Sequence, residues 1–362
     1  MDRRLRVGVI GTSWWTETFH LAGLASHPRA ELVAICGRDR ARAVDVAARH
    51  GQPLVYTDYR TMISSGLIDA VVVATPDDSH REVVLTAIES GLHVLCEKPL
   101  ARSAKDARRM LDAAEAGGRV HMAMFTWRWL AVFTHLRHLL ATGYIGRCRD
   151  ARFVMQAEYA HEPTYGWRFD PHRGSGIVGD LGSHMIDLAR LYLGEIIQVS
   201  AQLTSHVGRP GPDGERATSL DDSATLMVEF ASGARGIIDV SGVRLVGALP
   251  NQRIGLYGDE GSLEADVEGG SARLRGKSRT DESWQILPIP AELLGLDGIH
   301  PPILDIPLLA PLTNRPVGDR LFVDAALGNA PAEPTFDDAW HTQRVVDAAV
   351  VANRERRWAP VI

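Results

Sequence analysis

Apolar and polar positions divide the chain into two parts with different rhythms. In the first part, short apolar runs alternate with longer amphipathic stretches, and two of the runs carry no polar face. Strands that are apolar on both sides are typical of a parallel sheet covered by helices. The predicted strands are 6–10, 31–35, 70–74 and 93–96, with Val55 as a candidate for a further short strand. The predicted helices are 40–50, 59–64, 80–90 and 104–116. This pattern predicts a doubly wound α/β domain over residues 1–122.

After about residue 122 the pattern changes to long strands in which apolar and polar residues alternate. These strands predict a large, mostly antiparallel open sheet in an α+β domain over residues 123–362. They are expected at 151–159, 199–207, 224–230 and 234–241, with one helix near 181–193 and a final amphipathic helix over 336–355. The composition of 208–214 predicts a mobile loop, and 265–315 shows little periodicity.

A glycine turn follows the first predicted strand, where a dinucleotide pyrophosphate can rest on helix N–H groups. Its pattern departs from G-x-G-x-x-G, because Ser13 and Thr16 follow Gly11 at the second and third glycine positions. An ordinary strand-to-helix turn is the alternative, but its place in a complete βαβ unit favours dinucleotide binding. The candidate cofactor residues in this turn are Gly11, Thr12, Ser13, Trp14 and Trp15.

The residues after the second predicted strand bear on the choice between NAD and NADP. In such folds an acidic residue here binds the ribose 2′-hydroxyl and repels a 2′-phosphate. This chain has Gly37 and Arg38 instead, so a guanidinium is available to a phosphate. We therefore predict that NADP is favoured over NAD. Asp39 is the counter-argument, because it can pair with Arg38 or turn inward, and Arg38 can also lie on the surface or stack on adenine.

Two further strand ends carry polar residues at the edge of the sheet where ligands collect. Thr75 and Pro76 follow the third apolar run, with His80 at the start of the next predicted helix. Glu97 and Lys98 stand before a proline directly after the fourth run. Taken singly, the first group is most often a turn with a helix cap, and the second a surface turn with a solvated lysine. Together we expect them to line the cofactor site.

Charge and composition narrow the class of protein further. A net charge of −6 offers no general attraction to nucleic acid or anionic lipid, so neither partner is expected. Cys36, Cys96 and Cys148 are too few and too far apart for a disulfide framework or a metal site, which fits free thiols in a reducing cytosol. No apolar run reaches the roughly 18 residues of a membrane helix, and no secretory signal is recognisable. We expect a cytoplasmic protein without a metal.

The order of these motifs resembles the Gfo/Idh/MocA family, the glucose-fructose oxidoreductase and inositol dehydrogenase group of nicotinamide enzymes. The resemblance is carried first by the Gly11 turn, Thr75-Pro76 with His80, and Glu97-Lys98-Pro99. It continues through Arg128, Gly166-Trp167-Arg168, Gly174-Ser175-Gly176, the run from Gly179-Asp180 through His184 to Asp187, and Phe336-Asp337-Asp338. It spans nearly the whole chain except 265–315. The resemblance implies hydride transfer between NAD(P) and a secondary alcohol or ketone of a sugar, inositol or related polyol.

In that family the lysine of Glu-Lys-Pro and an Asp-x-x-x-His pair form the catalytic set, which by motif falls on Lys98, Asp180 and His184. The i, i+4 spacing puts Asp180 and His184 on one helix face. Histidine's ordinary pKa of about 6.5 suits a general base, while Lys98 would stabilise charge on the same oxygen. The resemblance allows either residue as the formal acid/base. Taken alone, Asp180 is more often a helix cap and His184 a packing residue.

Further expectations concern the substrate and partners. A polyol needs directed hydrogen bonds and an aromatic platform, and the candidates beyond the catalytic set are Arg128, Trp167, Arg168 and His172. Trp127 and Trp129 flank Arg128 and can serve packing alone. An exposed sheet face predicts a homodimer or homotetramer through the second domain. Two other functions stay open: a sensor that binds the cofactor without turnover, and a glycosidase that retains its nicotinamide.

Overall fold

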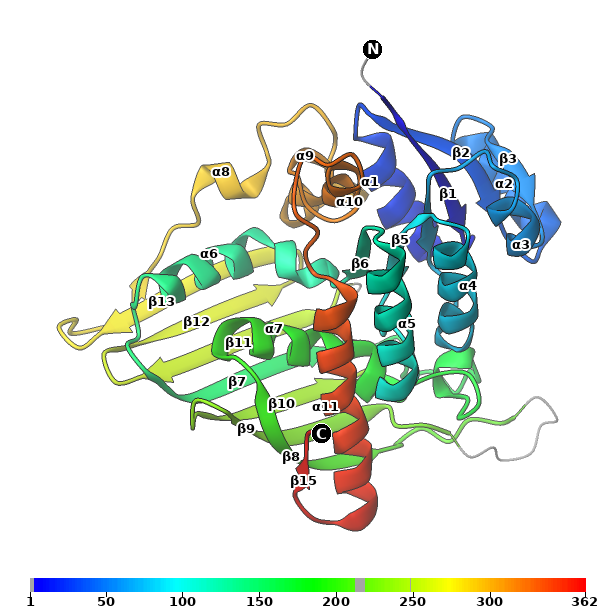
Figure 1. Ribbon diagram of the computed structural model, residues 1–362. Helices are drawn as coiled ribbons and strands as arrows, with labels where there is room; N and C mark the ends of the chain where they lie inside the picture. The colour runs from blue at the N-terminus through cyan, green and yellow to red at the C-terminus, as the bar shows by residue number, and fades with distance from the viewer. Residues whose placement is uncertain (1–2, 212–218, 248) are drawn as a thin grey trace. The chain divides into compact units, whose positions relative to one another are not determined.

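The computed structural model describes residues 3–211, 219–247 and 249–362. The chain forms two compact units (Figure 1). Unit 1 consists of the chain up to Ala101, then Lys105–Trp129 and Gly295–Trp340, whereas unit 2 consists of Arg102–Ala104, Leu130–Leu294 and His341–Ile362. The predicted boundary between residues 122 and 123 stays a prediction. The predicted fold class, a doubly wound domain plus a domain with an open antiparallel sheet, is confirmed.

Unit 1 is built on a six-stranded sheet in the order β3-β2-β1-β4-β5-β6, with every neighbouring pair parallel. This order reverses between β1 and β4, and ligands of such sheets bind at that switch point, beyond the carboxyl ends of the strands. The strands are β1 Leu5–Ile10, β2 Ala30–Cys36, β3 Leu54–Tyr56, β4 Ala70–Val73, β5 His93–Glu97 and β6 His121–Met124. The candidate strand at Val55 is therefore confirmed as β3, and β6 is a strand that the periodicity did not reveal.

Helices cover both faces of this sheet. They are α1 Ala22–Ala25 with the preceding π-helical segment Thr16–Leu21, α2 Arg40–Arg49, α3 Tyr59–Ile63, α4 Asp77–Glu89 and α5 Ala104–Gly117. The carboxylates of Asp39 and Asp58 cap α2 and α3 by accepting hydrogen bonds from backbone N–H groups of the first turn. Each cap lies directly after a strand, so the sequence specifies where the chain leaves the sheet and where the helix begins.

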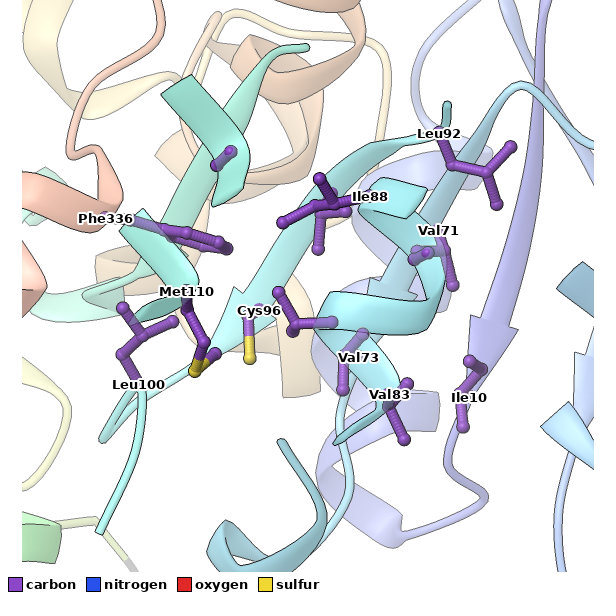
Figure 2. Close-up of a cluster of buried hydrophobic side chains, with 14 of the residues drawn as sticks. Ile10, Val71, Val73, Val83, Ile88, Leu92, Cys96, Leu100, Met110 and Phe336 are labelled. Atoms are coloured by element: carbon purple, nitrogen blue, oxygen red, sulfur yellow. The ribbon is translucent and has the colours of Figure 1, made fainter. Parts of the chain in front are cut away.

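The apolar runs of the sheet form two buried clusters, one on each face. Figure 2 shows the first cluster, in which Val73 of β4 and Cys96 of β5 pack with Val83 of α4 and Met110 of α5. Phe336, more than 200 residues further along the chain than Met110, joins this cluster and is fully buried. The core of unit 1 therefore includes residues from the last part of the sequence.

The same holds for the opposite face of the sheet. Phe322 and Val323 of α10 belong to the same buried cluster as Val7 and Val9 of β1 and Leu21. The elements of this late segment are the 3₁₀ turns Ile303–Asp305 and Pro307–Leu309 and the helices α9 Pro311–Asn314 and α10 Asp319–Ala326. Residues 295–340 thus complete the core around the six-stranded sheet of unit 1. The first part of this segment, up to residue 315, had no predicted order.

Unit 2 is built on a nine-stranded sheet in the order β14-β13-β12-β11-β7-β10-β9-β8-β15. All neighbours are antiparallel except β7 and β10, so the sheet is mixed but mostly antiparallel. The strands are β7 Cys148–Gln156, β8 Ile196–Thr204, β9 Ser223–Phe230, β10 Arg235–Ser241, β11 Asn251–Gly258, β12 Gly261–Glu268, β13 Ser271–Ser278, β14 Gln285–Ile286 and β15 Ala359–Pro360.

One face of this sheet is covered by helices, as α6 packs on β12 and β13 and α7 on β7 (Figure 1). The helices of unit 2 are α6 Ala131–Ala141, α7 Ser183–Leu193 with the preceding π-helical segment Val178–Gly182, α8 Ala291–Leu294 and most of α11 Phe336–Glu355. Along β9 and β10, buried residues alternate with exposed ones, as expected for a sheet with one open face.

Some sequence predictions need correction in detail. Helix α4 begins at Asp77, three residues before the predicted start, because Pro76 is extended and Asp77 can therefore open the helix. Strand β7 begins and ends about three residues before the predicted 151–159. In the loop predicted to be mobile at 208–214, residues 212–214 lie outside the described residues, whereas Arg209 is fully buried. The Arg209 side chain lies in the interior of unit 2, where it pairs with Asp222.

The three cysteines are free thiols, two buried and one partly buried, as predicted. Within the described ranges, no group of three or more His, Cys, Asp or Glu side chains is arranged to hold a metal ion. In the same part of the chain, no helix is long and apolar enough to cross a membrane.

Candidate active site

The glycine turn lies at the switch point of the unit 1 sheet. Gly11 follows β1 with φ +130°, a conformation that side chains disfavour. A Cβ atom added to Gly11 would lie 2.2 Å from the carbonyl oxygen of Ala74, just past β4. The chain ends of β1 and β4 therefore approach each other so closely that only glycine fits. This is the close backbone approach that a dinucleotide-binding turn requires.

Ser13 and Thr16 occupy the positions where the usual pattern has glycines. The Oγ atom of Ser13 accepts a hydrogen bond from the backbone N–H of Thr16 at 3.1 Å, and the two hydroxyl oxygens are 2.9 Å apart. Thr16 is fully buried and begins the π-helical segment that precedes α1. The hydroxyl groups thus cap the helix start, and the wider π-helical turn accommodates a side chain where glycine is usual.

The end of β2 carries the residues that bear on cofactor choice. A Cβ atom on Gly37 would lie 2.6 Å from the Cγ2 of Thr12, so a larger residue at this position would have to displace the Thr12 side chain. The Asp39 carboxylate accepts a hydrogen bond from the backbone N–H of Arg42 at 3.1 Å as the cap of α2. Arg38 is exposed. The Asp39 carboxylate is therefore engaged at the start of α2.

Glu97, Lys98 and Trp15 come together at the carboxyl end of β5. The Glu97 carboxylate accepts a hydrogen bond from the Trp15 indole N–H at 2.6 Å and from the backbone N–H of Lys98 at 3.0 Å. The Trp15 ring stacks on Phe19 with centroids 3.9 Å apart, whereas Trp14 is exposed. Glu97 thus fixes both the backbone that carries Lys98 and the indole ring from the glycine turn.

His80 connects the two polar strand ends. It is fully buried, and its ring nitrogens lie 2.8 Å from the carbonyl oxygen of Thr75 and 3.0 Å from that of Pro99. Burial opposes charge on the ring, but neighbouring Cys96 and Asp77 and the strand-end carbonyl outweigh it and raise the pKa of His80 to about 10. Both ring N–H groups are thereby available as donors. His80 ties the turn after β4 to the turn after β5.

In unit 2, Asp180 lies in the π-helical segment that runs into α7, and His184 is buried in the first turn of α7. The Oδ2 atom of Asp180 accepts hydrogen bonds from the Tyr159 hydroxyl at 2.5 Å and from Arg168 Nε at 3.0 Å. Tyr159 was missed by the sequence analysis, because it lies in a loop 21 residues before Asp180 and belongs to no motif. These two donors hold the Asp180 carboxylate in one orientation.

The other candidate substrate residues lie in different surroundings. The Arg168 guanidinium lies 4.5 Å from the centre of the Trp167 ring, so both belong to the group around Asp180. His172 is exposed. Arg128 is buried in unit 1, where it forms an ion pair with Asp338 at 3.0 Å. The described structure therefore places Trp167 and Arg168 beside Asp180 and gives Arg128 a partner from α11.

A buried carboxyl group supports the segment that carries Asp180. The Oδ2 atom of Asp221 accepts a hydrogen bond from the backbone N–H of Val178 at 2.8 Å, and a Cβ on Gly176 would lie 2.1 Å from its Oδ1. Burial raises the pKa of Asp221 to about 7, and the charge of adjacent Asp222 adds to this effect. Asp221 thus gains a proton near neutral pH at the start of the π-helical segment.

This pKa predicts how stability depends on pH. The raised pKa favours the protonated native form, so the contribution of Asp221 is fully present below about pH 4 and is lost as the pH rises through about 7. We expect Asp221→Asn to raise the free energy of unfolding by about 1–3 kcal/mol more at pH 8 than at pH 5. Urea unfolding at both pH values measures this, with the exposed Asp45→Asn as control. An equal effect of Asp221→Asn at both pH values would contradict the prediction.

Two known domain families match most of the chain. The family described as an oxidoreductase family with an NAD-binding Rossmann fold matches residues 5–125, and the GFO/IDH/MocA C-terminal domain matches residues 133–264. The chain belongs to the Gfo/Idh/MocA family. The resemblance that the motifs indicated is thereby confirmed, and it covers both units.

Gfo/Idh/MocA relatives of this chain include several sugar dehydrogenases. The levoglucosan dehydrogenase of Pseudarthrobacter phenanthrenivorans is 30% identical over 268 residues, which are 66% of this chain and 68% of that protein. The NADP-dependent scyllo-inositol 2-dehydrogenase of Bacillus subtilis is 31% identical over 60% of this chain and 66% of its own length. A solved structure of levoglucosan dehydrogenase in complex with NADH aligns with a TM-score of 0.86 at 26% identity, covering 99% of this chain and 100% of that one.

Membership of the Gfo/Idh/MocA family gives the Rossmann sheet of unit 1 a role in binding NAD(P). The residues at its switch point fit this cofactor, because Gly11 lets the chain turn tightly from β1 towards the start of the following helix, where a pyrophosphate rests on backbone N–H groups. Whether NAD or NADP is preferred is not decided by the family, since its relatives include an NADP-dependent enzyme and one solved with NADH.

Proposed function

We propose that this protein oxidises a secondary alcohol of a sugar or polyol, or reduces the matching ketone, with Lys98, Asp180 and His184 as its catalytic residues. The observation that carries this proposal is the position of Lys98 at the binding edge of a Rossmann sheet, with its backbone N–H fixed by Glu97. The bound nicotinamide supplies the hydride chemistry, so the chain's own residues bind, orient and move the proton.

In the oxidation direction, the reacting carbon loses a hydride while its hydroxyl loses a proton. His184 accepts that proton as general base, and the Lys98 ammonium donates a hydrogen bond to the same oxygen as its negative charge develops. Asp180 binds a neighbouring substrate hydroxyl. Tyr159 and Arg168 support this assignment of Asp180, because they engage one of its carboxylate oxygens and fix the direction of the other. In reduction, the proton moves from His184 to the product oxygen.

We further propose that NADP is preferred over NAD. Gly37 brings no acidic side chain to this position, Asp39 is engaged at the start of α2, and exposed Arg38 is available to a 2′-phosphate. The candidate cofactor residues are Gly11, Thr12, Ser13, Trp14, Trp15, Gly37, Arg38, Thr75, Pro76, His80, Glu97 and Lys98, with His80 acting through the two turns that it connects. Trp167, Arg168, His172 and Arg128 stay proposals as substrate-binding residues.

A panel of sugars, sugar acids and inositols tests the function and the cofactor preference together. We expect at least one member of the panel to reduce NADP, measured by the absorbance of the reduced nicotinamide, with a kcat/KM for NADP about tenfold or more above that for NAD. A strong preference for NAD would contradict the proposed role of Arg38. Hydrolysis of a glycoside without added cofactor would instead favour the glycosidase, and cofactor binding without turnover of any substrate the sensor.

Self-association through the open face of the unit 2 sheet is also proposed. Met227 of β9 and Ile237 of β10 are directly opposite each other on this face and are exposed, and Ile197 of β8 is exposed on the neighbouring strand. Adjacent exposed apolar side chains favour burial against a second copy. A homodimer or homotetramer and a cytoplasmic location both stay predictions.

A further inference from the structure

A histidine outside the family's motifs contacts the Glu-Lys-Pro turn inside unit 1. His20 lies in the π-helical segment after the glycine turn and is fully buried. Its Nε2 atom lies 3.0 Å from Oε1 of Glu97, and its Nδ1 atom lies 2.9 Å from Oδ1 of Asp319. Asp319 opens α10, so the histidine joins the cofactor edge of the sheet to the late segment that completes its core.

The carboxyl groups on both ring nitrogens favour a protonated His20. Two carboxylates, one on each ring nitrogen, require two N–H donors, which only an imidazolium provides. Burial opposes the charge, but the carboxylates of Asp319 and Glu97 outweigh it and raise the pKa of His20 to about 10. Burial likewise opposes ionisation of Glu97, yet His20 and Lys98 hold its pKa below the usual value. His20 is therefore a buried cation between two carboxylates.

The Glu97 carboxylate connects His20 to two residues of the proposed site, Trp15 and Lys98. Its Oε1 atom is shared by His20 and the Trp15 indole, and its Oε2 atom accepts the backbone N–H of Lys98. We propose that His20 is a positioning residue that, anchored by Asp319, orients Glu97 and through it Lys98 and Trp15. This inference rests on the proposed catalytic role of Lys98. His20 itself is not a catalytic residue, because both of its ring nitrogens are engaged.

The anchor is itself closely packed. A Cβ added to Gly23 of α1 would lie 2.9 Å from Oδ2 and 3.0 Å from Cβ of Asp319. Gly23→Ala therefore displaces Asp319 without changing any charge or hydrogen-bonding group. The packing gives a second, independent way to disturb the orientation of His20.

The test compares His20→Gln with the double variant His20→Gln/Asp319→Asn. In the single variant a glutamine amide can donate to Glu97, but its oxygen then faces the Asp319 carboxylate, and two anions are left without the imidazolium. In the double variant the asparagine NH₂ can donate to that oxygen, which restores a complete chain of hydrogen bonds to Glu97. We expect kcat to fall about 10–100-fold in His20→Gln and to recover at least threefold in the double variant, with the Kd for NADP changed less than kcat.

His27 offers a matched control, because it is also buried and pairs with Asp324 of α10 at 3.3 Å, away from Glu97. His27→Gln is expected to lower the melting temperature while leaving kcat within about twofold. If His20→Gln does not fold, Gly23→Ala and Asp319→Asn are measured instead, and each is expected to lower kcat more than KM changes. The proposal is overturned if folded His20→Gln has the same kcat as the His27→Gln control. It is also overturned if Gly23→Ala and Asp319→Asn both have that kcat.

Substitutions of Lys98 and His20 distinguish an error in the proposed site from an error in the positioning role. If Lys98→Met retains full turnover, the proposed site is wrong and His20 has nothing to position. If Lys98→Met is inactive while His20→Gln matches the wild type, the site stands and the positioning role is wrong. A double variant that is folded but no more active than the single one also counts against the role, because the restored chain of hydrogen bonds to Glu97 would then not restore activity.

Discussion

Lys98→Met is expected to lower kcat by about 10²–10⁴-fold, because it removes the donor that stabilises the charge developing on the substrate oxygen. Methionine keeps the length of the side chain while losing its charge. The melting temperature should change little, since Glu97 holds the backbone N–H of residue 98, which the substitution keeps. Initial rates with saturating NADP and the best substrate of the sugar panel, together with thermal unfolding, measure both effects.

Lys105→Met is the matched control, as Lys105 is exposed near the start of α5, and its activity should equal that of the wild type. His184→Ala extends the test to the proposed base. The pH profile of kcat then separates the two roles, because loss of the general base removes the acidic limb of the profile. Full activity in both Lys98→Met and His184→Ala would refute the catalytic assignment.

The sequence predicted the polar strand ends of unit 1 because their information is local. Thr75-Pro76 and Glu97-Lys98 follow apolar runs that predict buried strands, and parallel strands bring their carboxyl ends to one edge. His20 and Asp319 could not be predicted in this way. They are 299 positions apart and meet only because α10 packs on α1 and β5, contacts that no local period encodes.

The outer strands of the unit 2 sheet were not predicted for a different reason. In β12, buried Leu263, Ala265 and Val267 alternate with polar residues as a half-buried strand should. The stretch taken as lacking order began at 265 and cut this pattern in the middle. Its partner β13 has a single large buried aliphatic residue, Leu274, and its arginines Arg273 and Arg275 form cross-strand ion pairs with Asp266 and Glu264 of β12. Polar pairing at the outer part of a sheet therefore hides the alternation.

Arg209→Met is expected to destabilise the protein by about 3–5 kcal/mol, the cost of leaving a buried partner charge uncompensated. Arg209 and Asp222 are both fully buried, with Nη1 and Oδ2 3.0 Å apart. The guanidinium also donates to the carbonyl oxygen of Ala160 and lies 3.8 Å from the centre of the Phe169 ring. Methionine can fill part of the volume, but it neither pairs with Asp222 nor holds these two segments. Urea unfolding at pH 7 measures the loss.

Activity should fall together with stability, because Ala160 directly follows Tyr159, the residue that donates to Asp180. The double variant Arg209→Met/Asp222→Asn is expected to recover about 1–2 kcal/mol, since asparagine removes the unpaired charge and still offers an oxygen to one of the two backbone N–H groups, of residues 206 and 207, that donate to the Asp222 carboxylate. Arg244→Met is the surface control, because Arg244 is half exposed and lies 3.8 Å from its partner Asp239. It should cost at most about 1 kcal/mol. Equal losses in Arg209→Met and Arg244→Met would show that the buried pair contributes no more than an ordinary surface contact, and the loop around Arg209 would then owe its position to other packing.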